Sequence, residues 1–480
     1  MIAINDLQMF AASLEERGLL HRIKAPVDRD LELAHVAVMG ERAKGPALIF
    51  DNVIGFDIPI LISAFTSPSR MAVALGVEPG PSMPELSRLW MERTTAGLIP
   101  PVTVNNAMVA KNQLTGDDVD VNHFPAPQLY PKDGGRFFGT TAYLVCRDPE
   151  TGWANLGTYR MQILEPNRVG VQFLQGKDAD HILKKYKARG EKMPAAAVLG
   201  GDPLLFLASA TFIGTGISEL DIVGALRQKP VEVWQSDLTG LPLPAGAEIV
   251  LEGHIDPDDP CHEGPLGEYT GYYTHDHWSK PALKIQRILH RDQPLFWSCT
   301  VGKPVNDIHM LQCLSRTGGI WHDLETMKIP GIESVYVPPE ACGWFWTIVS
   351  IRQMYPGHAN QVGNAVLASS GGHHATKGVI VVDHDIAADD LSGVWWALST
   401  RFDPSRSLTL DQGRATKLDP SLPYGDRHIT GRMIINACIP YEWEEKPEQV
   451  ELDAEMVAKV KARWADFDMP DIDPNRIMGI

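Results

Sequence analysis

The chain has 480 residues, of which 44% are hydrophobic and 21% are charged, and its formal net charge is −17. This composition is ordinary for a globular protein of two or three domains with a large core, and it excludes disordered and fibrous classes. The negative charge argues against a nucleic-acid surface or docking on anionic lipid, because both require clustered Lys and Arg.

The first part of the chain, residues 1–105, reads as a small α/β unit. Apolar residues recur at helical spacing over 5–20, and Asp6 is suited to cap that helix. Residues 46–65 are rich in Ile and Phe and are broken by Gly and Pro, which predicts strands. Residues 66–96 read as helical again.

The central part, residues 106–305, contains short β-branched runs separated by turn residues. This spacing predicts an antiparallel sheet or barrel. We expect its strands at 102–110, 140–147, 160–166, 168–174, 231–238, 247–255 and 282–290. Two helical segments, 179–189 and 219–227, interrupt the strand pattern.

The last part, residues 306–480, alternates helix and strand and predicts a C-terminal α/β domain. The apolar run at 379–382, bounded by charge, reads as a buried strand and precedes a helix at 391–402. Residues 451–467 have an amphipathic pattern, which predicts a terminal helix.

The cysteines and the N-terminal residues indicate where in the cell the protein is located. The six cysteines lack CxxC spacing, which indicates reduced, buried thiols. The N-terminus has acids where a signal peptide needs a basic region, and no stretch of about 18 apolar residues occurs. We therefore expect a cytoplasmic protein with no membrane span and no nucleic-acid partner.

The first stretch with candidate catalytic residues is Glu263-Gly-Pro-Leu-Gly-Glu268. Pro265 fixes the backbone and the glycines permit close approach, so the turn can hold two carboxylates over one spot. Two carboxylates in one pocket acquire different pKa values, so one can donate a proton while the other stays ionised. The alternative is a solvated turn with two surface acids.

Two further stretches lie upstream. In Asn155-Leu-Gly-Thr-Tyr-Arg160, Arg160 can clamp a carboxylate or phosphate with its planar fork, or be an ordinary surface arginine. On one regular strand Asn155 and Arg160 would face opposite sides unless Gly157 forms a bulge. The stretch 133–141, DGGRFFGTT, offers backbone N–H groups that suit a phosphate.

Other catalytic motifs are absent from the sequence. The pairs His275/His277 and His373/His374 lack the Cys and His spacing of a zinc site, and no HExxH helix is present. There is no GxxxxGK[ST], no GxGxxG after a strand and no GxSxG. Kinase, dinucleotide-dependent dehydrogenase and serine hydrolase functions therefore lose their main support.

The order and distance of these motifs resemble the UbiD family of decarboxylases. The residues that carry the resemblance are DGGRFFGTT, NLGTYR, GISELDIVGAL (216–226), EGPLGEYTGYY and KGVIVVDHDI…WWALSTRFDP. The resemblance covers nearly the whole chain. It implies a mixed α/β (α+β) fold with a central split β-barrel of the flavin-reductase-like type. An N-terminal α/β region and a C-terminal α/β domain with an oligomerisation helix would flank that barrel.

The activity that the resemblance implies is reversible, non-oxidative decarboxylation (EC 4.1.1) of an aromatic or heteroaromatic acid. It would proceed through a covalent adduct with prenylated FMN, which a separate flavin prenyltransferase supplies. By the same resemblance Glu268 is the proton donor, Arg160 contacts the substrate carboxylate and the flavin, and Glu263 links the two. The residues expected to bind the cofactor are Thr140, Thr141, Asn155, Arg160, Gln175 and Arg432.

The family metal is a divalent cation held by an Asn, a His and a Glu. Asn155 matches the Asn, whereas Asp178 stands near the expected His and Gln235 near the expected Glu. These three oxygen donors suit Mn²⁺ or Mg²⁺, and K⁺ is an optional further ion. Because two positions differ from the family, the sequence leaves open an altered or weakened metal site.

The substrate and assembly are the least determined features. By family position, His309 and Trp344 are expected in the substrate pocket, where Trp344 would stack on a ring or else belong to the core. The expected assembly is a homodimer or homohexamer. Two alternative functions remain: a non-catalytic flavin-binding scaffold subunit, and a plain FMN oxidoreductase.

Overall fold

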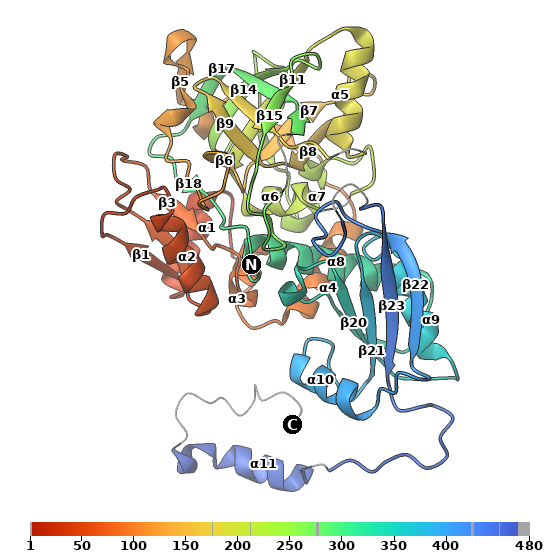
Figure 1. The fold of residues 1–480 in the computed structure, drawn as a ribbon. Coiled ribbons are helices and arrows are strands. Elements are labelled where there is room, and N and C mark those ends of the chain that lie inside the picture. Colours follow the sequence, from red (N-terminus) through yellow and green to blue (C-terminus); the bar gives the residue numbers. More distant parts are fainter. Residues whose placement is uncertain are drawn as a thin grey trace. The chain divides into compact units, whose positions relative to one another are not determined.

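The structure is a computed structural model that describes residues 2–174, 176–211, 213–274, 278–423, 427–450 and 452–468. The chain divides into two compact units (Figure 1). Unit 1 comprises Met1–Gly318, Pro339–Trp344 and Lys417–Pro423, and unit 2 comprises Gly319–Pro338, Phe345–Thr416 and Tyr424–Ile480. Within the described ranges, no helix combines the length and the apolar character needed to cross a membrane.

The first sheet of unit 1 joins segments that are far apart in the sequence. Its four strands lie in the order β1-β2-β3-β18. Their bounds are β1 Leu20–Ile23, β2 Ala47–Phe50, β3 Ile60–Ile62 and β18 Phe296–Trp297. The strand β18 pairs parallel with β3, so the N-terminal region is completed by a strand from the end of the central region.

The helices of this region begin where the sequence supplies caps. Helix α1 (Leu7–Glu16) is confirmed, and the Asp6 carboxylate accepts a 2.8 Å hydrogen bond from the backbone N–H of Met9. The segment 66–96 is two helices rather than one, because Ser67 and Ser82 each cap a new start. These helices are α3 Pro68–Ala74 and α4 Met83–Thr95, and α2 spans Glu32–Arg42.

The second sheet of unit 1 has nine strands and antiparallel neighbours, as the sequence predicts. Eight strands follow the order β6-β9-β10-β17-β14-β11-β7-β8, and β5 pairs with β17. The bounds are β5 Asn112–Thr115, β6 Phe137–Gly139, β7 Tyr143–Arg147, β8 Ala154–Thr158, β9 Met161–Glu165, β10 Arg168–Val171, β11 Met193–Gly200, β14 Ala247–Ile255 and β17 Ala282–His290. Five of these strands, β7, β9, β10, β14 and β17, come from the predicted runs, whereas β5, β6, β8 and the alanine-rich β11 were not among the expected strands.

The nine-stranded sheet curls on itself. The strands β8 and β9 lie toward opposite ends of the strand order, yet only Tyr159 and Arg160 separate them in the chain. Two residues span roughly 10 Å at most, so the two ends of the sheet must approach each other at this point. Among the described strands no backbone pairing joins β8 to β9 or β6, so the sheet curls without closing.

Smaller elements complete unit 1. The strand expected at 102–110 is wrong beyond its first two residues: β4 is only Val102–Thr103, and a 3₁₀ helix follows at Met108–Ala110. The strand expected at 231–238 is β12 Glu232–Gln235, which lies outside the nine-stranded sheet: it pairs parallel with β4 and antiparallel with β13 Pro242–Pro244. The strand β15 Cys261–Glu263 pairs with β16 Trp278–Lys280. The helices are α5 Asp178–Arg189, α6 Pro203–Ser209 and α7 Glu219–Arg227, of which α5 and α7 confirm the predicted helical segments.

Unit 2 is built on a five-stranded mixed sheet in the order β19-β20-β21-β23-β22. Its strands are β19 Ile332–Tyr336, β20 Trp346–Ile351, β21 Gly378–Asp383, β22 Leu408–Arg414 and β23 Ile429–Ala437. The strand β21, which contains the predicted run 379–382, is buried at the middle of the sheet. Its parallel neighbours are β20 and β23.

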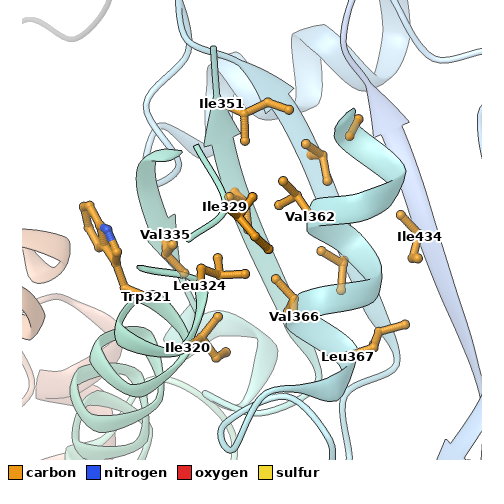
Figure 2. Close-up of a cluster of buried hydrophobic side chains, with 14 of the residues drawn as sticks. Ile320, Trp321, Leu324, Ile329, Val335, Ile351, Val362, Val366, Leu367 and Ile434 are labelled. Carbon is orange, nitrogen blue, oxygen red and sulfur yellow. The ribbon is translucent and has the colours of Figure 1, made fainter. Parts of the chain in front are cut away.

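Helix α9 (His358–Ala368) covers this sheet and closes the core of unit 2. Val362 and Val366 on α9 pack into a cluster that also contains Ile351 and Ile434 (Figure 2). A side chain on Gly363 would place its Cβ 2.4 Å from Ile434, so glycine lets the helix lie close on the sheet. The remaining helices are α8 Asp307–Thr326, which begins in unit 1, α10 Leu391–Thr400 and α11 Ala454–Ala462.

Helix α11 confirms the terminal helix that the amphipathic pattern predicts. None of its residues is buried, and Met456 on its apolar face is 53% exposed. Its expected role in oligomerisation stays a prediction.

Candidate active site

An arginine between two glutamates forms the candidate active site in unit 1. The Arg160 guanidinium donates to both carboxylate oxygens of Glu263, from Nε at 2.7 Å and from Nη2 at 2.8 Å, and it donates from Nη1 to Glu268. The Arg160 and Glu263 side chains are 8% and 0% exposed, whereas Glu268 keeps 13%. The predicted trio is therefore one buried ion-pair network, and Glu268 is its more accessible acid.

The electrostatics of this network favour a permanently charged arginine. Burial lowers the pKa of Arg160, but the charges and hydrogen bonds of Glu268 and Glu263 outweigh burial and raise it above its usual value. With both acids ionised, one cation faces two anions, so the network carries one net negative charge. A proton taken up by one glutamate would make it neutral.

Arg160 reaches this position because the NLGTYR segment connects β8 to β9, which lie toward opposite ends of the strand order of the curled sheet. Asn155 lies on β8, whereas Arg160 directly precedes β9, so the two residues do not share one strand. The question of opposite faces on a single strand therefore does not arise. Gly157 makes room for the next turn of chain, since a Cβ there would lie 2.5 Å from the Tyr159 ring.

The turn that carries both glutamates is held by residues outside it, among them Gln162 and Asp133. The Gln162 amide accepts from the Gly264 N–H at 2.6 Å and donates to the Gly134 carbonyl at 2.8 Å. The Asp133 carboxylate accepts from the Gly267 N–H at 2.8 Å. The stretch 133–141, which suggested a phosphate site, thus supplies residues that position the acidic turn.

Close packing explains the second glycine of this turn. A Cβ on Gly267 would lie 2.7 Å from the ring of Tyr130, so any side chain there would collide with that ring. Tyr130 is itself fixed, because its N–H donates to Asp133 at 2.8 Å and its hydroxyl donates to the Val301 carbonyl at 2.5 Å. The spacing of the EGPLGE motif therefore reflects backbone contacts as well as chemistry.

A second polar cluster lies around Asn155. The Asn155 amide donates to Glu219 at 3.2 Å, and Glu219 also accepts from the Leu156 N–H at 2.7 Å. Glu219 is the first residue of α7 and is buried. Burial raises the pKa of Glu219 to about 8. The hydrogen bond from the Leu156 N–H opposes this rise in pKa, and the nearby negative charge of Asp178 adds to it.

This cluster changes the expected metal ligands. Gln235 lies on β12 and donates to the Gly240 carbonyl, and no hydrogen bond within the described part of the chain joins it to Asn155 or Glu219. Asp178 begins α5 and accepts a 3.2 Å hydrogen bond from Thr215. The structure therefore brings Glu219, not Gln235, to Asn155.

Glu219 was missed although a signal for it was available. It lies in GISELDIVGAL, one of the segments that carry the resemblance, but that segment was interpreted only as a helix. Among the described side chains no cluster of three or more His, Cys, Asp or Glu is arranged to hold a metal ion. Asn155, Glu219 and Asp178 therefore amount to a partial set of oxygen donors.

The remaining cofactor residues have varied surroundings. The Thr140 hydroxyl lies 3.0 Å from that of Ser298, and the Thr141 hydroxyl donates to the Trp297 carbonyl at 2.6 Å, so both are buried in internal hydrogen bonds. Arg432 lies on β23 in unit 2, where it pairs with Asp411. Gln175, together with His275 and His277, lies outside the described residues.

The two residues expected in the substrate pocket have structural partners. His309 is fully buried: its Nδ1 accepts from the Asn306 N–H at 3.1 Å, and its Nε2 donates to the Tyr269 carbonyl at 2.6 Å. Both ring nitrogens are thus occupied, so His309 is not available to a substrate hydroxyl as expected. Burial lowers the pKa of His309 to about 4, which keeps the imidazole neutral.

Trp344 shares the cluster around Tyr269. Its indole N–H donates to Gln312 at 2.6 Å, the Arg316 guanidinium lies 4.2 Å from its ring, and its ring centroid is 5.3 Å from that of Tyr269. Trp344 is partly buried against this cluster, and its expected place in the substrate pocket stays a prediction.

Three family models match consecutive parts of the chain. They describe the N-terminal, Rift-related and C-terminal domains of 3-octaprenyl-4-hydroxybenzoate carboxy-lyase, and they match residues 11–90, 101–304 and 309–437. The chain belongs to the UbiD family. It is a carboxy-lyase, and the resemblance seen in the motifs is confirmed over most of its length.

Solved UbiD-class structures share the fold over nearly the whole chain. HmfF from Pelotomaculum thermopropionicum, in complex with FMN, is 27% identical with a TM-score of 0.86, covering 96% of this chain and 100% of that one. Vanillic acid decarboxylase from Sedimentibacter hydroxybenzoicus, in closed form, is 29% identical with a TM-score of 0.83, covering 97% and 99%. The apo 3,4-dihydroxybenzoic acid decarboxylase from Enterobacter cloacae is 25% identical with a TM-score of 0.85, covering 97% and 100%.

Proposed function

We propose that this UbiD-family enzyme catalyses the reversible, non-oxidative decarboxylation of an aromatic or heteroaromatic acid with prenylated FMN. The observation that carries the proposal is the buried Glu263–Arg160–Glu268 network. Overall, a carboxylate and a proton become an aryl C–H bond and CO₂. The site must therefore bind an anion, deliver one proton and exclude water.

Each member of the network has a role that follows from its surroundings. Arg160 keeps its charge and offers the cation that an anionic substrate needs inside an acidic protein. Glu268 is the proton donor, because it is the acid that retains exposure and can exchange protons with solvent. Glu263, fully buried and bonded twice to Arg160, fixes the guanidinium.

The flavin is supported by relatives, and the metal is supported by the oxygen donors of this chain. HmfF has been solved with FMN and, in an evolved dimeric form, with prFMN. When bound, prenylated FMN would supply the electron sink for the charge left as CO₂ departs. Glu219, Asn155 and Asp178 would hold Mn²⁺ or Mg²⁺, whose charge would favour the ionised form of the buried Glu219. K⁺ rests on the resemblance alone.

The broader setting of the reaction is also proposed. The relatives named for vanillic acid and 3,4-dihydroxybenzoic acid support an aromatic substrate, with CO₂ as the second product. A flavin prenyltransferase would supply the cofactor in the cytoplasm. We propose a homodimer or homohexamer, a split β-barrel for the curled central sheet, and three regions at 1–105, 106–305 and 306–480.

The alternative functions are less well supported. The scaffold alternative rested on the two metal-ligand positions that differ from the family. Because Glu219 lies beside Asn155, most of that support is lost. An FMN oxidoreductase transfers hydride and has no need of a Glu–Arg–Glu network.

The deciding experiment is co-expression with a flavin prenyltransferase, followed by intact cofactor mass and CO₂ release from a panel of aromatic acids. We expect a mass of prenylated FMN and release of CO₂. Glu268→Gln should retain the flavin and lose at least about 100-fold in rate, the usual size of a general-acid contribution. The control Glu191→Gln, at an exposed position, should leave the rate unchanged. Full activity in Glu268→Gln would refute the assigned donor.

A further inference from the structure

A buried glutamine beside the active site has a side-chain oxygen without a hydrogen-bond partner. Gln172 is 7% exposed, and its Oε1 accepts no hydrogen bond. No hydrogen bond joins either of its amide atoms to the residues that the structure describes. Nearly all buried polar atoms in proteins are paired, so the buried Oε1 of Gln172 calls for a hydrogen-bond donor from outside the chain, either a bound molecule or water.

The strand register places Gln172 directly beside Arg160. On the neighbouring strands Gly170 pairs with Gln162 and Val171 pairs with Met161, and the Gln172 N–H donates to the Arg160 carbonyl at 3.1 Å. Cross-strand neighbours in an antiparallel sheet present their side chains to the same face. Gln172 and Arg160 continue this pairing one step beyond the ends of β10 and β9, which makes them backbone neighbours.

The face to which Gln172 points is the one occupied by the catalytic acids. A Cβ on Gly170, two residues before Gln172, would lie 3.4 Å from the Glu263 side chain. Side chains two residues apart along a strand point to the same side. The Gln172 amide therefore belongs to the same face as Glu263.

A second cation borders the same place. Lys280 donates from Nζ to the carbonyl of Phe173, the residue after Gln172, at 3.0 Å. Burial lowers the pKa of Lys280, the charge of Glu263 opposes that effect, and the charge of Arg160 adds to it, so all three groups are within electrostatic reach. A neutral amide on a residue bordered by these two cations is suited to a neutral polar group on a ligand whose carboxylate lies at Arg160.

We propose that Gln172 is a specificity residue that hydrogen-bonds a hydroxyl group on the aromatic ring of the substrate. A hydroxyl can donate to Oε1 and accept from Nε2, which satisfies both amide atoms at once. An acid without that hydroxyl leaves Oε1 buried and unpaired. This inference rests on the proposed decarboxylase function and narrows its substrate class to hydroxyaryl acids.

The size of the discrimination follows from the cost of an unpaired buried amide. Sites built to hydrogen-bond a substrate hydroxyl reject analogues that lack it, whereas apolar sites barely separate the two. We expect the best of the 2-, 3- and 4-hydroxybenzoates to exceed benzoate by roughly 10- to 100-fold in kcat/KM. Gln172→Leu, which keeps the volume and removes the amide, should abolish this preference by lowering the hydroxybenzoate values and raising the benzoate value.

The experiment has two readouts. The first is CO₂ release by the prenylated-FMN enzyme, and the second is the Kd of each acid for protein loaded with ordinary FMN, followed by the flavin absorbance. Gln113→Leu on the exposed strand β5 is the control and should preserve the preference. If Gln172→Leu fails to fold, Gln172→Glu retains the acceptor oxygen and should keep part of the preference.

Each contrary result has a distinct meaning. Equal loss for all acids in Gln172→Leu would show a structural role, and loss of bound flavin would show that the amide holds the cofactor. An unchanged preference would assign selection to another residue, and an absence of binding by any acid to the wild type would also refute the proposal. If the wild type binds the hydroxybenzoates but releases no CO₂, the decarboxylase function fails while the Kd values still test Gln172.

Discussion

Gln162 offers the most direct test of how the acidic turn is positioned. Its side chain is 5% exposed and bridges the Gly264 N–H and the Gly134 carbonyl. Gln162→Leu removes both bonds at similar volume. Gly264 is buried, so its N–H would remain unpaired, whereas Gly134 is exposed and its carbonyl can bond to water. The cost therefore arises mainly at Gly264, at about 1–3 kcal/mol.

Amide hydrogen exchange measures this cost at the site itself. A local opening that becomes about 1–3 kcal/mol easier speeds exchange of the Gly264 amide by roughly 5- to 150-fold. Because Gly264 follows Glu263, we also expect a loss of about 10- to 100-fold in kcat, the effect of misplacing a reacting group by about 1 Å. The Gly134 N–H still donates to the Pro265 carbonyl at 2.8 Å, so the turn should loosen rather than unfold.

The control is the same substitution where no buried group depends on the glutamine. Gln113→Leu on the exposed strand β5 should leave both exchange at Gly264 and kcat unchanged. Exchange at Gly264 that is unaffected by Gln162→Leu would refute the bridging role. Faster exchange with full activity would show that the position of the turn does not limit the reaction.

Three further outcomes are expected. Gly267→Ala should lower both Tm and kcat, because its Cβ would lie 2.7 Å from the Tyr130 ring, whereas Gly431→Ala, with no atom within 4 Å, should be neutral. His309 titrates at about 4 when folded, below its unfolded value near 6.5, so stability should fall as pH drops from about 6.5 to 4, by up to roughly 3 kcal/mol. Denaturant unfolding at both pH values should show a smaller pH effect in His309→Gln. Thiol titration should find that Cys342 reacts first, since the other five cysteines are buried.

The local pattern of the sequence was enough to predict most elements of the fold. Helices α5, α7 and α10 and the antiparallel central sheet follow from periodicity and turn residues, and caps such as Asp6 mark where helices begin. The strand predicted at 102–110 was wrong because the alternation of apolar and polar residues there is too short to form a strand beyond Thr103. Boundaries of this kind depend on pairing partners that a local pattern does not specify.

The network of Arg160, Glu263 and Glu268 was recognised in advance because each motif concentrates its chemistry within six residues. A rigid turn with two acids is a local property of Gly and Pro, and it can be read without knowing the neighbours. The resemblance then connected the two motifs, and the structure joins them across 103 residues of chain.

Other assignments depended on contacts that only folding creates. Glu219 reaches Asn155 across 64 residues, while Gln235 is carried to a different small sheet. Gln162 accepts a hydrogen bond from Gly264, 102 residues away in the chain, and both ring nitrogens of His309 are hydrogen-bonded to backbone groups. The sequence by itself determined the chemical groups and the local turns that present them. The tertiary structure alone decided which groups meet, because strand register and burial bring together residues whose local patterns contain no record of one another.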